Sequence, residues 1–359
     1  MSGGVMVMAG GTGGHVFPAL AVAEALRERG VFVSWLGSRD SFESRVVPEH
    51  GFDIHLIDIK GLRGKGLMRW LIAPFKLTTA LFQARGVLKT RKPQVVLGMG
   101  GFVAGPGGLM AKLLGIPLVI HEQNAVPGMT NNWLAKFAVR VFEAFPNSFA
   151  QGTGAVACGN PVRRDIVALD NPELRMRDRQ GPVRLLVIGG SLGAQALNEA
   201  VPTIIAGMDA IKRPVIRHQA GRDKADATRA AYSAAGVDAE VTPFIKDMAE
   251  AYGWADLVIC RSGALTVSEL AAAGVGSLLV PYPYAVDDHQ TKNAGYLVNV
   301  NAAKLVPQSE LEQKGLSDEL LPLFEDREQL IQMAAKARSV SMPDATKCVA
   351  DYCEEIMAR

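Results

Sequence analysis

The sequence is poor in cysteine, and its cysteines lack the spacing that metal or redox sites need. Only four occur among 359 residues, none in a Cys-x-x-Cys pair and none within a His-rich stretch. A zinc site and a dithiol redox motif are therefore not indicated. We expect reduced, buried thiols, as in proteins of a reducing compartment.

An excess of charge of one sign is also missing. Lys and Arg number 38 and Asp and Glu 36, and the resulting net charge of +2 is too small for a general nucleic-acid-binding protein. We expect no nucleic-acid partner.

No stretch of the chain is suited to spanning a membrane. The long uncharged run over residues 93–111 contains six glycines and two prolines, a composition unsuited to a lipid-exposed helix. The first five residues include no basic side chain, so we predict no signal peptide.

One segment combines positive charge with large apolar side chains. Residues 60–92 contain nine basic residues and no acidic one. Cations beside a broad apolar face suit docking onto anionic phospholipid. A helix packed on the core is the alternative, because Pro74 interrupts the pattern and core helices also carry apolar stripes. The expected membrane patch consists of Arg69, Trp70, Leu71, Phe75 and Lys76.

Continuous apolar runs that alternate with Ala-rich helical patterns indicate the fold class. Such runs are typical of parallel strands covered on both faces by helices. We predict an α/β protein with two Rossmann-like, doubly wound parallel-sheet domains facing a cleft. The expected strands are 5–9, 31–36, 95–98, 117–121, 139–142 and a short 156–158 in the first domain, and 184–188, 215–218, 240–242, 257–260, 277–280 and 303–306 in the second.

An internal similarity supports this division. The strand ending in Gly10-Gly11-Thr12-Gly13-Gly14 resembles the strand ending in Gly189-Gly190-Ser191-Leu192-Gly193, and Gly10 and Gly189 are 179 residues apart. We expect an N-terminal domain over residues 1–162 and a C-terminal domain over 163–343. The final helical segment, 344–359, is expected to pack back on the N-terminal domain.

The two glycine loops suit phosphate binding, because glycine lets the backbone approach an anion at the start of a helix. Either loop alone could be a turn without a ligand. The first departs from the dinucleotide fingerprint, since Val16 replaces the third glycine and no acidic residue follows at Gly37-Ser38-Arg39. No Gly-Lys-Ser/Thr follows, which excludes a Walker loop.

A third segment, residues 261–269, follows a buried strand and begins a helix with small and hydroxyl side chains. Glu269 lies within this otherwise apolar helix. A buried carboxylate is costly unless it is paired or bound to a ligand, so a diol-binding role is one interpretation and an exposed helical Glu is the other.

Several motifs in order resemble one known family. These are 10–15, the His-Glu-Gln-Asn run 121–124, Gly-Asn-Pro-Val-Arg at 159–163, 189–194, 261–269 and Asp-His-Gln-Thr-Lys-Asn at 288–293. Together they closely resemble the MurG family, the undecaprenyldiphospho-muramoylpentapeptide N-acetylglucosaminyltransferases of bacterial peptidoglycan synthesis. The resemblance covers nearly the whole chain. It implies the GT-B architecture and an enzyme that needs no cofactor.

The resemblance also implies a donor site for UDP-N-acetylglucosamine. Ile245 would meet uracil through its backbone and Glu269 the ribose diol. Ser191, Arg163 and the helix start at 264–266 would hold the diphosphate, and Asn124 and Gln290 would contact the sugar. The backbone amides of Thr12, Gly13 and Gly14 also suit the acceptor diphosphate, although family members count these residues in the donor site. The expected donor-site residues are Thr12, Gly13, Gly14, Asn124, Arg163, Ser191, Ile245, Ala264, Leu265, Thr266, Val267, Ser268, Glu269 and Gln290. Thr291 departs from the family pattern, where a second Gln often stands, so a sugar contact by that position is not carried over.

The implied reaction inverts the anomeric carbon, so a base must take the proton of the acceptor C4 hydroxyl while positive charge stabilises departing UDP. His15 is the expected base, because histidine titrates near neutrality. Binding the acceptor diphosphate is its alternative role, and Glu122 is the next candidate base. No Asp-x-Asp motif occurs near either glycine loop, so we expect no metal site and assign UDP stabilisation to Arg163 and helix dipoles.

The implied acceptor is the undecaprenyl-diphosphate-linked muramoyl-pentapeptide, and the implied location is the cytoplasmic face of the bacterial membrane as a peripheral protein. Another GT-B enzyme, such as a lipid glycosyltransferase or a UDP-sugar epimerase, is the first alternative. A nicotinamide-dependent oxidoreductase is disfavoured by the missing glycine and acidic residue. A non-catalytic membrane scaffold would not require two glycine loops.

Overall fold

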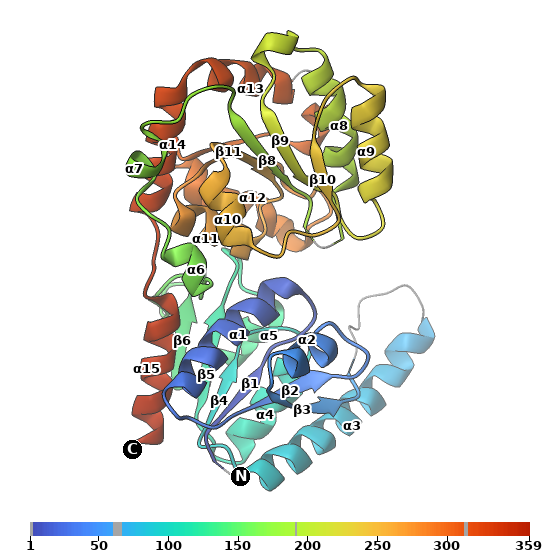
Figure 1. The fold of residues 1–359 in the computed structure, drawn as a ribbon. Coiled ribbons are helices and arrows are strands. Elements are labelled where there is room, and N and C mark those ends of the chain that lie inside the picture. The colour runs from blue at the N-terminus through green and yellow to red at the C-terminus, as the bar shows by residue number, and fades with distance from the viewer. Residues whose placement is uncertain (1–2, 60–66, 191, 312–314) are drawn as a thin grey trace. The chain divides into compact units, whose positions relative to one another are not determined.

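The computed structural model describes residues 3–59, 67–190, 192–311 and 315–359, with residues 67–73 described by their backbone alone. The chain divides into two compact units. Unit 1 comprises Met1–Arg163 and Met342–Arg359, and unit 2 comprises Arg164–Ser341. Figure 1 labels the elements of both.

Unit 1 is a seven-stranded sheet in the order β3-β2-β1-β4-β5-β6-β7, with every pair parallel. Its elements are β1 (Val5–Met8), α1 (Gly13–Glu28), β2 (Val33–Ser38), α2 (Glu43–Glu49), β3 (Asp53–Ile57), α3 (Leu67–Arg91), β4 (Val95–Gly98), α4 (Ala104–Leu113), β5 (Leu118–Glu122), α5 (Met129–Leu134), β6 (Arg140–Glu143), β7 (Val156–Ala157) and α15 (Ala345–Met357).

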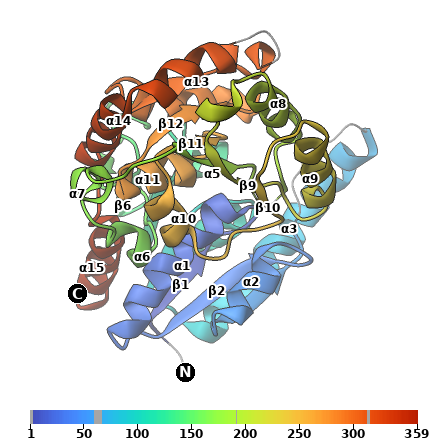
Figure 2. The ribbon, with the colours of Figure 1, turned by 45° about the horizontal axis from the view of Figure 1, so that its top comes forward.

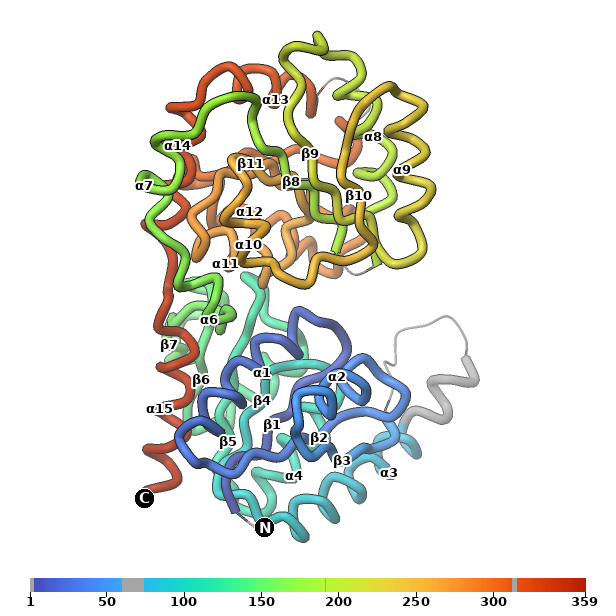
Figure 3. The backbone as a smooth tube through the Cα atoms, in the orientation of Figure 1, coloured from blue at the N-terminus to red at the C-terminus, as the bar shows by residue number. Residues whose placement is uncertain are grey.

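Alternate strand residues of unit 1 enter two different cores, because successive side chains of a strand point to opposite faces. Val5 and Val7 of β1 pack with α1, α2 and α15, whereas Met6 and Met8 pack with α3, α4 and α5. The C-terminal helix α15 lies beside α1, as Figures 1 and 3 both show. Helices therefore cover both faces of the sheet, which explains its continuous apolar strands.

Unit 2 is a six-stranded parallel sheet in the order β10-β9-β8-β11-β12-β13. Its elements are α6 (Arg164–Val167), α7 (Pro172–Met176), β8 (Arg184–Ile188), α8 (Gln195–Ala206), β9 (Val215–Gln219), α9 (Ala225–Ala234), β10 (Glu240–Thr242), α10 (Met248–Trp254), β11 (Leu257–Cys260), α11 (Ala264–Ala273), β12 (Gly276–Leu279), α12 (His289–Val298), β13 (Ala303–Leu305), α13 (Gly315–Glu325) and α14 (Arg327–Ser339), with short 3-10 turns at Ala210–Lys212, Val286–Asp288 and Gln308–Glu310.

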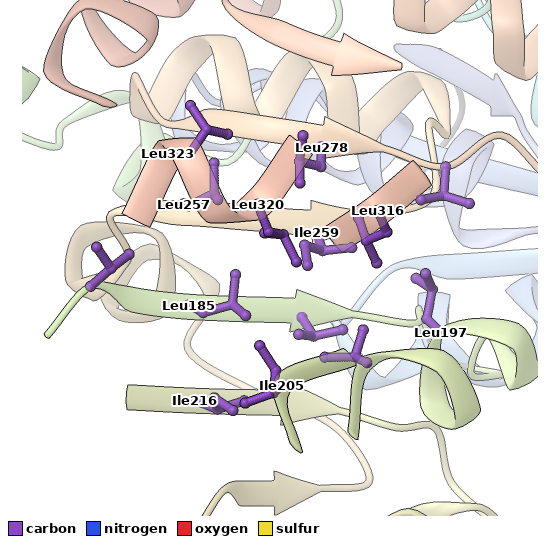
Figure 4. Close-up of a cluster of buried hydrophobic side chains, with 14 of the residues drawn as sticks. Leu185, Leu197, Ile205, Ile216, Leu257, Ile259, Leu278, Leu316, Leu320 and Leu323 are labelled. Atoms are coloured by element: carbon purple, nitrogen blue, oxygen red, sulfur yellow. The ribbon is translucent and has the colours of Figure 1, made fainter. Parts of the chain in front are cut away.

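One face of the unit 2 sheet packs against α8, α9, α13 and α14. Leu185, Leu257 and Leu278 from three neighbouring strands meet Leu197 of α8 and Leu320 of α13 in this core (Figure 4). Figure 2 shows α8 and α9 on one side of the strands and α10 and α11 on the other. Both units are therefore doubly wound.

Two sequence expectations differ from the structure. The edge strand β3 was not expected, because its half-exposed Asp53–Ile57 sequence includes Asp and His and forms no continuous apolar run. Pro74 was expected to interrupt the helical pattern, yet α3 continues through it from Leu67 to Arg91.

Candidate active site

The topology of each sheet places its chemistry-bearing loops at one edge. The strand order reverses between β1 and β4 in unit 1 and between β8 and β11 in unit 2. In open parallel sheets, ligands bind beyond the carboxyl ends of the strands at this reversal. Both glycine loops and the 261–263 segment lie at these ends, so each unit presents one candidate binding region.

The first glycine loop holds its backbone open at the start of α1. Thr12 is the N-cap residue in an extended conformation, and its carbonyl accepts from the N–H groups of His15 and Val16. Gly13 and Gly14 form the first turn, where backbone N–H groups have no partner within the helix. These two N–H groups can therefore meet an anion, and the helix dipole favours one.

A buried carboxylate lies behind this loop. Glu43 accepts hydrogen bonds from the N–H of Gly11 at 3.0 Å and from the N–H and hydroxyl of Ser38 at 3.0 and 2.5 Å. Burial would raise the pKa of Glu43, but these hydrogen bonds outweigh it and hold that pKa below its usual value. Because it occupies the N–H of Gly11, Glu43 orders the loop and leaves anion binding to the next turn.

Sequence reasoning missed Glu43. A ribose-binding carboxylate was expected only at Gly37-Ser38-Arg39, at the end of β2, where no acidic residue stands. Glu43 begins the following helix and turns back toward Gly10, whose added Cβ would lie 2.5 Å from a Glu43 carboxylate oxygen. The glycine at position 10 was the one available signal for this close approach.

His15 lies in the first turn of α1 and contacts two neighbouring loops. Its Nδ1 is 2.6 Å from Oε1 of Gln123. Nε2 of Gln123 is 2.9 Å from Nδ1 of His121, and Nε2 of His121 is 2.9 Å from the carbonyl of Gly159. Burial lowers the pKa of His121 to about 4, so this histidine is neutral at pH 7.

Glu122 is buried beside this chain of contacts. Its carboxylate accepts from the N–H of Asn124 at 2.9 Å, the N–H of Gly128 at 3.1 Å and the amide of Asn131 at 2.9 Å. The side-chain amide of Asn124 also donates to Glu122 at 3.2 Å. These contacts hold the loop after β5 in place.

In unit 2, the loop after β8 is packed tightly against the loop after β9. The N–H of Gly189 donates to the carbonyl of Gln219 at 3.0 Å, and a Cβ on Gly193 would lie 2.0 Å from the carbonyl of Ala220. Ser191 lies outside the described residues. The side-chain oxygen Oε1 of Gln219 accepts from the N–H of Ile245 at 3.2 Å. The backbone of Ile245, which is expected to meet uracil, therefore already has one hydrogen-bond partner.

The N-terminus of α11 presents the remaining loop of unit 2. Gly263 is the N-cap, and Ala264, Leu265 and Thr266 form the first turn, whose N–H groups have no partner within the helix. Val267 is fully buried, and the hydroxyl of Ser268 donates to the carbonyl of Ala264 at 3.0 Å. Val267 therefore faces the core, whereas the hydroxyl of the half-buried Ser268 is bonded along its own helix.

Glu269 is buried, with 7% of its surface exposed. Its Oε2 accepts from the hydroxyl of Tyr252 on α10 at 3.0 Å. Burial and the nearby charge of Glu269 both raise the pKa of the Cys260 thiol. Sequence reasoning missed Tyr252, because only the fold brings α10 against α11.

Two further expected donor residues lie at the ends of loops. Oε1 of Gln290 accepts from the N–H of Tyr282 at 2.9 Å. In the loop between Tyr282 and Gln290, Asp287 and Asp288 adopt left-handed φ angles of 54° and 50°. Such strained backbone is common at binding sites. Arg163, half-buried, is the last residue of the first segment of unit 1.

The expected membrane patch is described in part. The side chains of Arg69, Trp70 and Leu71 lie outside the described residues. Phe75 is 76% exposed and Lys76 is also exposed. In the part of the chain that the structure describes, no helix has both the length and the apolar character needed to cross a bilayer. The same part contains no cluster of three or more His, Cys, Asp and Glu side chains placed to hold a metal ion.

Comparisons with known proteins match nearly the whole chain. The glycosyltransferase family 28 N-terminal domain matches residues 5–143, and the family 28 C-terminal domain matches residues 184–349. A protein of Marinobacter nauticus named UDP-N-acetylglucosamine–N-acetylmuramyl-(pentapeptide) pyrophosphoryl-undecaprenol N-acetylglucosamine transferase is 54% identical, over 98% of this chain and 96% of its own length.

A protein of Aeromonas hydrophila with the same name is also 54% identical, over 99% of this chain and 98% of its own. Among solved structures, the crystal structure of Acinetobacter baumannii MurG superposes with a TM-score of 0.85 at 45% identity, covering 99% of this chain and all of that one.

Proposed function

The chain belongs to glycosyltransferase family 28, and on that basis we propose that it transfers N-acetylglucosamine from UDP-N-acetylglucosamine to undecaprenyl-linked muramoyl-pentapeptide. The product is lipid II of peptidoglycan synthesis, made from lipid I. The observation that carries this proposal is the 54% identity over nearly the full length to transferases of that name. The fold is GT-B, and two glycine loops at the reversal points of its two sheets suit substrates that both contain a diphosphate.

We assign the donor to unit 2. Glu269 would accept hydrogen bonds from the ribose diol, oriented for this by Tyr252. The first turn of α11 would hold the diphosphate with Arg163 and Ser191, because its N–H groups and helix dipole favour negative charge where UDP departs. Gln290 and Asn124 would contact the sugar. Ile245 would meet uracil either through its carbonyl or by releasing its N–H from Gln219.

We assign the acceptor and its activation to unit 1. The N–H groups of Gly13 and Gly14 would bind the acceptor diphosphate. His15 would remove the proton from the C4 hydroxyl as that oxygen attacks the anomeric carbon in line with departing UDP. Glu122 suits a supporting role better than that of base, because four N–H donors occupy its carboxylate. Proton transfer to it would break those hydrogen bonds.

Helix α3 would attach the enzyme to the cytoplasmic face of the membrane. Its inward residues Ala80, Ala84 and Leu88 recur every four positions and are buried, whereas Phe75 and Phe82, seven residues apart, are 76% and 68% exposed. A helix that buries alanines and exposes phenylalanines presents its larger apolar face outward. Together with the basic residues of 60–92, that face suits an anionic lipid surface.

The direct test is transfer of radiolabelled N-acetylglucosamine from its UDP donor to a short-chain lipid I analogue. We expect product with wild-type protein, and a 10²- to 10⁴-fold lower kcat in His15→Ala with a nearly unchanged donor KM, as loss of a general base requires. A folded wild-type protein that forms no product with this acceptor contradicts the proposed function. Full activity of His15→Ala contradicts only the choice of base.

A further inference from the structure

We propose that Gln123 and His121 are positioning residues that hold neutral His15 in its Nδ1–H tautomer, so that the lone pair of Nε2 is the one available to a substrate hydroxyl. This inference rests on the proposed function only for the identity of that hydroxyl. The tautomer itself follows from three contacts within unit 1.

The donor and acceptor roles in this series of hydrogen bonds are set at the end farthest from His15, by the carbonyl of Gly159. Nε2 of His121 is 2.9 Å from the carbonyl oxygen of Gly159, and a carbonyl can only accept a hydrogen bond. Nε2 of His121 therefore carries the proton. Gly159 has a φ of +86°, and a Cβ there would lie 2.4 Å from Cβ of Met342, so the carbonyl belongs to a closely packed turn.

His121 then dictates the orientation of the Gln123 amide. A neutral imidazole protonated on Nε2 has its lone pair on Nδ1 and needs a donor there. The amide nitrogen of Gln123 supplies that donor at 2.9 Å and also reaches the carbonyl of His121 at 3.1 Å. Nδ1 and the carbonyl of His121 are two acceptors on the same side of the Gln123 amide. The flipped amide would place its oxygen against both acceptors, so only one orientation is possible. Complete burial disfavours protonation of His121 and keeps this arrangement in force.

The orientation of the Gln123 amide determines which ring nitrogen of His15 carries the proton. With its nitrogen committed to His121, Gln123 presents Oε1 to Nδ1 of His15 at 2.6 Å, which requires a proton on that nitrogen. The lone pair of neutral His15 is therefore on Nε2. When Nε2 of His15 accepts a proton, the hydrogen bond from its Nδ1–H to Gln123 persists. Neither Gln123 nor His121 therefore has to reorient during the reaction.

The test is ¹⁵N NMR of the ring nitrogens of uniformly ¹⁵N-histidine-labelled protein at about pH 9, where an ordinary histidine is neutral. The His15 signals are assigned by their absence in His15→Gln. We expect a protonated-type Nδ1 and an unprotonated-type Nε2 in wild-type protein. The opposite pattern would overturn the proposal, whether or not the protein proves to be a transferase.

Two substitutions of similar size separate positioning from packing. Gln123→Met removes the acceptor, so we expect His15 to lose its fixed tautomer and kcat to fall on the order of 10²-fold with little change in donor KM. Gln123→Glu keeps an acceptor for Nδ1–H, so the His15 tautomer should remain that of wild type even if His121 is disturbed.

Thermal unfolding identifies a variant that fails to fold, and the wild-type spectrum and Gln123→Glu then still decide the tautomer. A folded Gln123→Met protein with an altered tautomer and wild-type kcat would contradict the positioning role. Absence of transfer by the wild-type protein itself would instead remove the proposed function and leave the tautomer result standing.

Discussion

Three buried carboxylates show how single residues organise this candidate site. Glu43 and Glu122 each accept three or more hydrogen bonds from neighbouring loops, and the carboxylate of Glu269 accepts from the hydroxyl of Tyr252. A buried charge is costly unless it is compensated in this way. Glu43 and Glu122 therefore fix loops, and the hydroxyl of Tyr252 holds Glu269.

We predict that Glu269→Ala weakens UDP binding by about 1.5 to 3 kcal/mol, because ribose hydroxyls would lose a charged acceptor. Isothermal titration calorimetry measures this loss. Tyr252→Phe is the matched control: it keeps the carboxylate and removes one hydrogen bond, so we expect a loss of only about 0.5 to 1.5 kcal/mol. Wild-type UDP affinity in folded Glu269→Ala would remove this residue from the donor site.

We also predict that Gly100→Ala displaces the His15 ring. Gly100 has a φ of +97°, and a Cβ there would lie 2.7 Å from Nδ1 of His15. Misplacement of a base by about 1 Å can cost on the order of 10²-fold in rate. Gly152→Ala imposes a similar strain at a φ of +92°, with no atom within 4 Å of the new Cβ, and should leave kcat unchanged. Equal rates for the two variants would contradict the steric account.

Helix α3 is the element whose sequence and packing disagree with an ordinary amphipathic helix. Its described inward face is lined by Ala80, Ala84 and Leu88, and its outward face carries Phe75 and Phe82. Burial of these phenylalanines against other parts of the same unit would have been the usual arrangement. Their exposure is the observation that supports the proposed contact of this helix with a lipid surface.

We predict that Phe75→Ser combined with Lys76→Glu reduces binding to phosphatidylglycerol vesicles, measured by co-sedimentation. Each cation near an anionic leaflet contributes about 1 kcal/mol, which salt weakens, and the apolar side chain adds a contribution that salt does not weaken. Ile211→Ser with Lys336→Glu replaces an exposed apolar and an exposed basic side chain in unit 2 and should bind as wild type. Transfer to a soluble acceptor should persist in both double variants. Unchanged vesicle binding of the α3 variant would contradict this assignment.

At the scale of the whole molecule, each unit contains one deeply buried neutral histidine. His121 lies in unit 1, and His218 lies in unit 2, where it contacts the hydroxyl of Tyr232 and Oδ1 of Asn198 at 3.0 Å each. Burial lowers the pKa of both to about 4 from the ordinary 6.5. The unfolded chain therefore binds more protons than the folded chain between these two values.

We predict that both units lose stability as the pH falls from about 6.5 toward 4. The contribution of each histidine is complete above pH 6.5, and by pH 5 about 2 kcal/mol per histidine should be lost. Urea unfolding at pH 7 and pH 5 tests this, with Trp35 reporting on unit 1 and Trp254 on unit 2. His218→Gln should reduce the pH dependence of the unit 2 transition alone. Equal unfolding free energies at the two pH values would contradict the prediction.

The sequence by itself determined the fold class, most strand positions and the family. Parallel strands buried on both faces must be continuous apolar runs, and the repeated glycine loops mark where each sheet begins, so both features can be read locally. The predicted α/β class and the family resemblance are confirmed by the two family 28 domain matches and by the similarity to a solved MurG structure. The edge strand β3 escaped this reasoning because it is only half-buried.

The tertiary structure alone decided which partners the candidate residues have. His15 and Gln123 are 108 residues apart in sequence, His121 and Gly159 are 38 apart, and Glu43 reaches Gly11 across 32. Periodicity describes a segment's own exposure, but hydrogen bonds of this kind depend on which strands the sheet makes neighbours. The placement of β1 beside β4, and of β4 beside β5, brings these loops together, and it thereby gives His15 a fixed tautomer that no local pattern encodes.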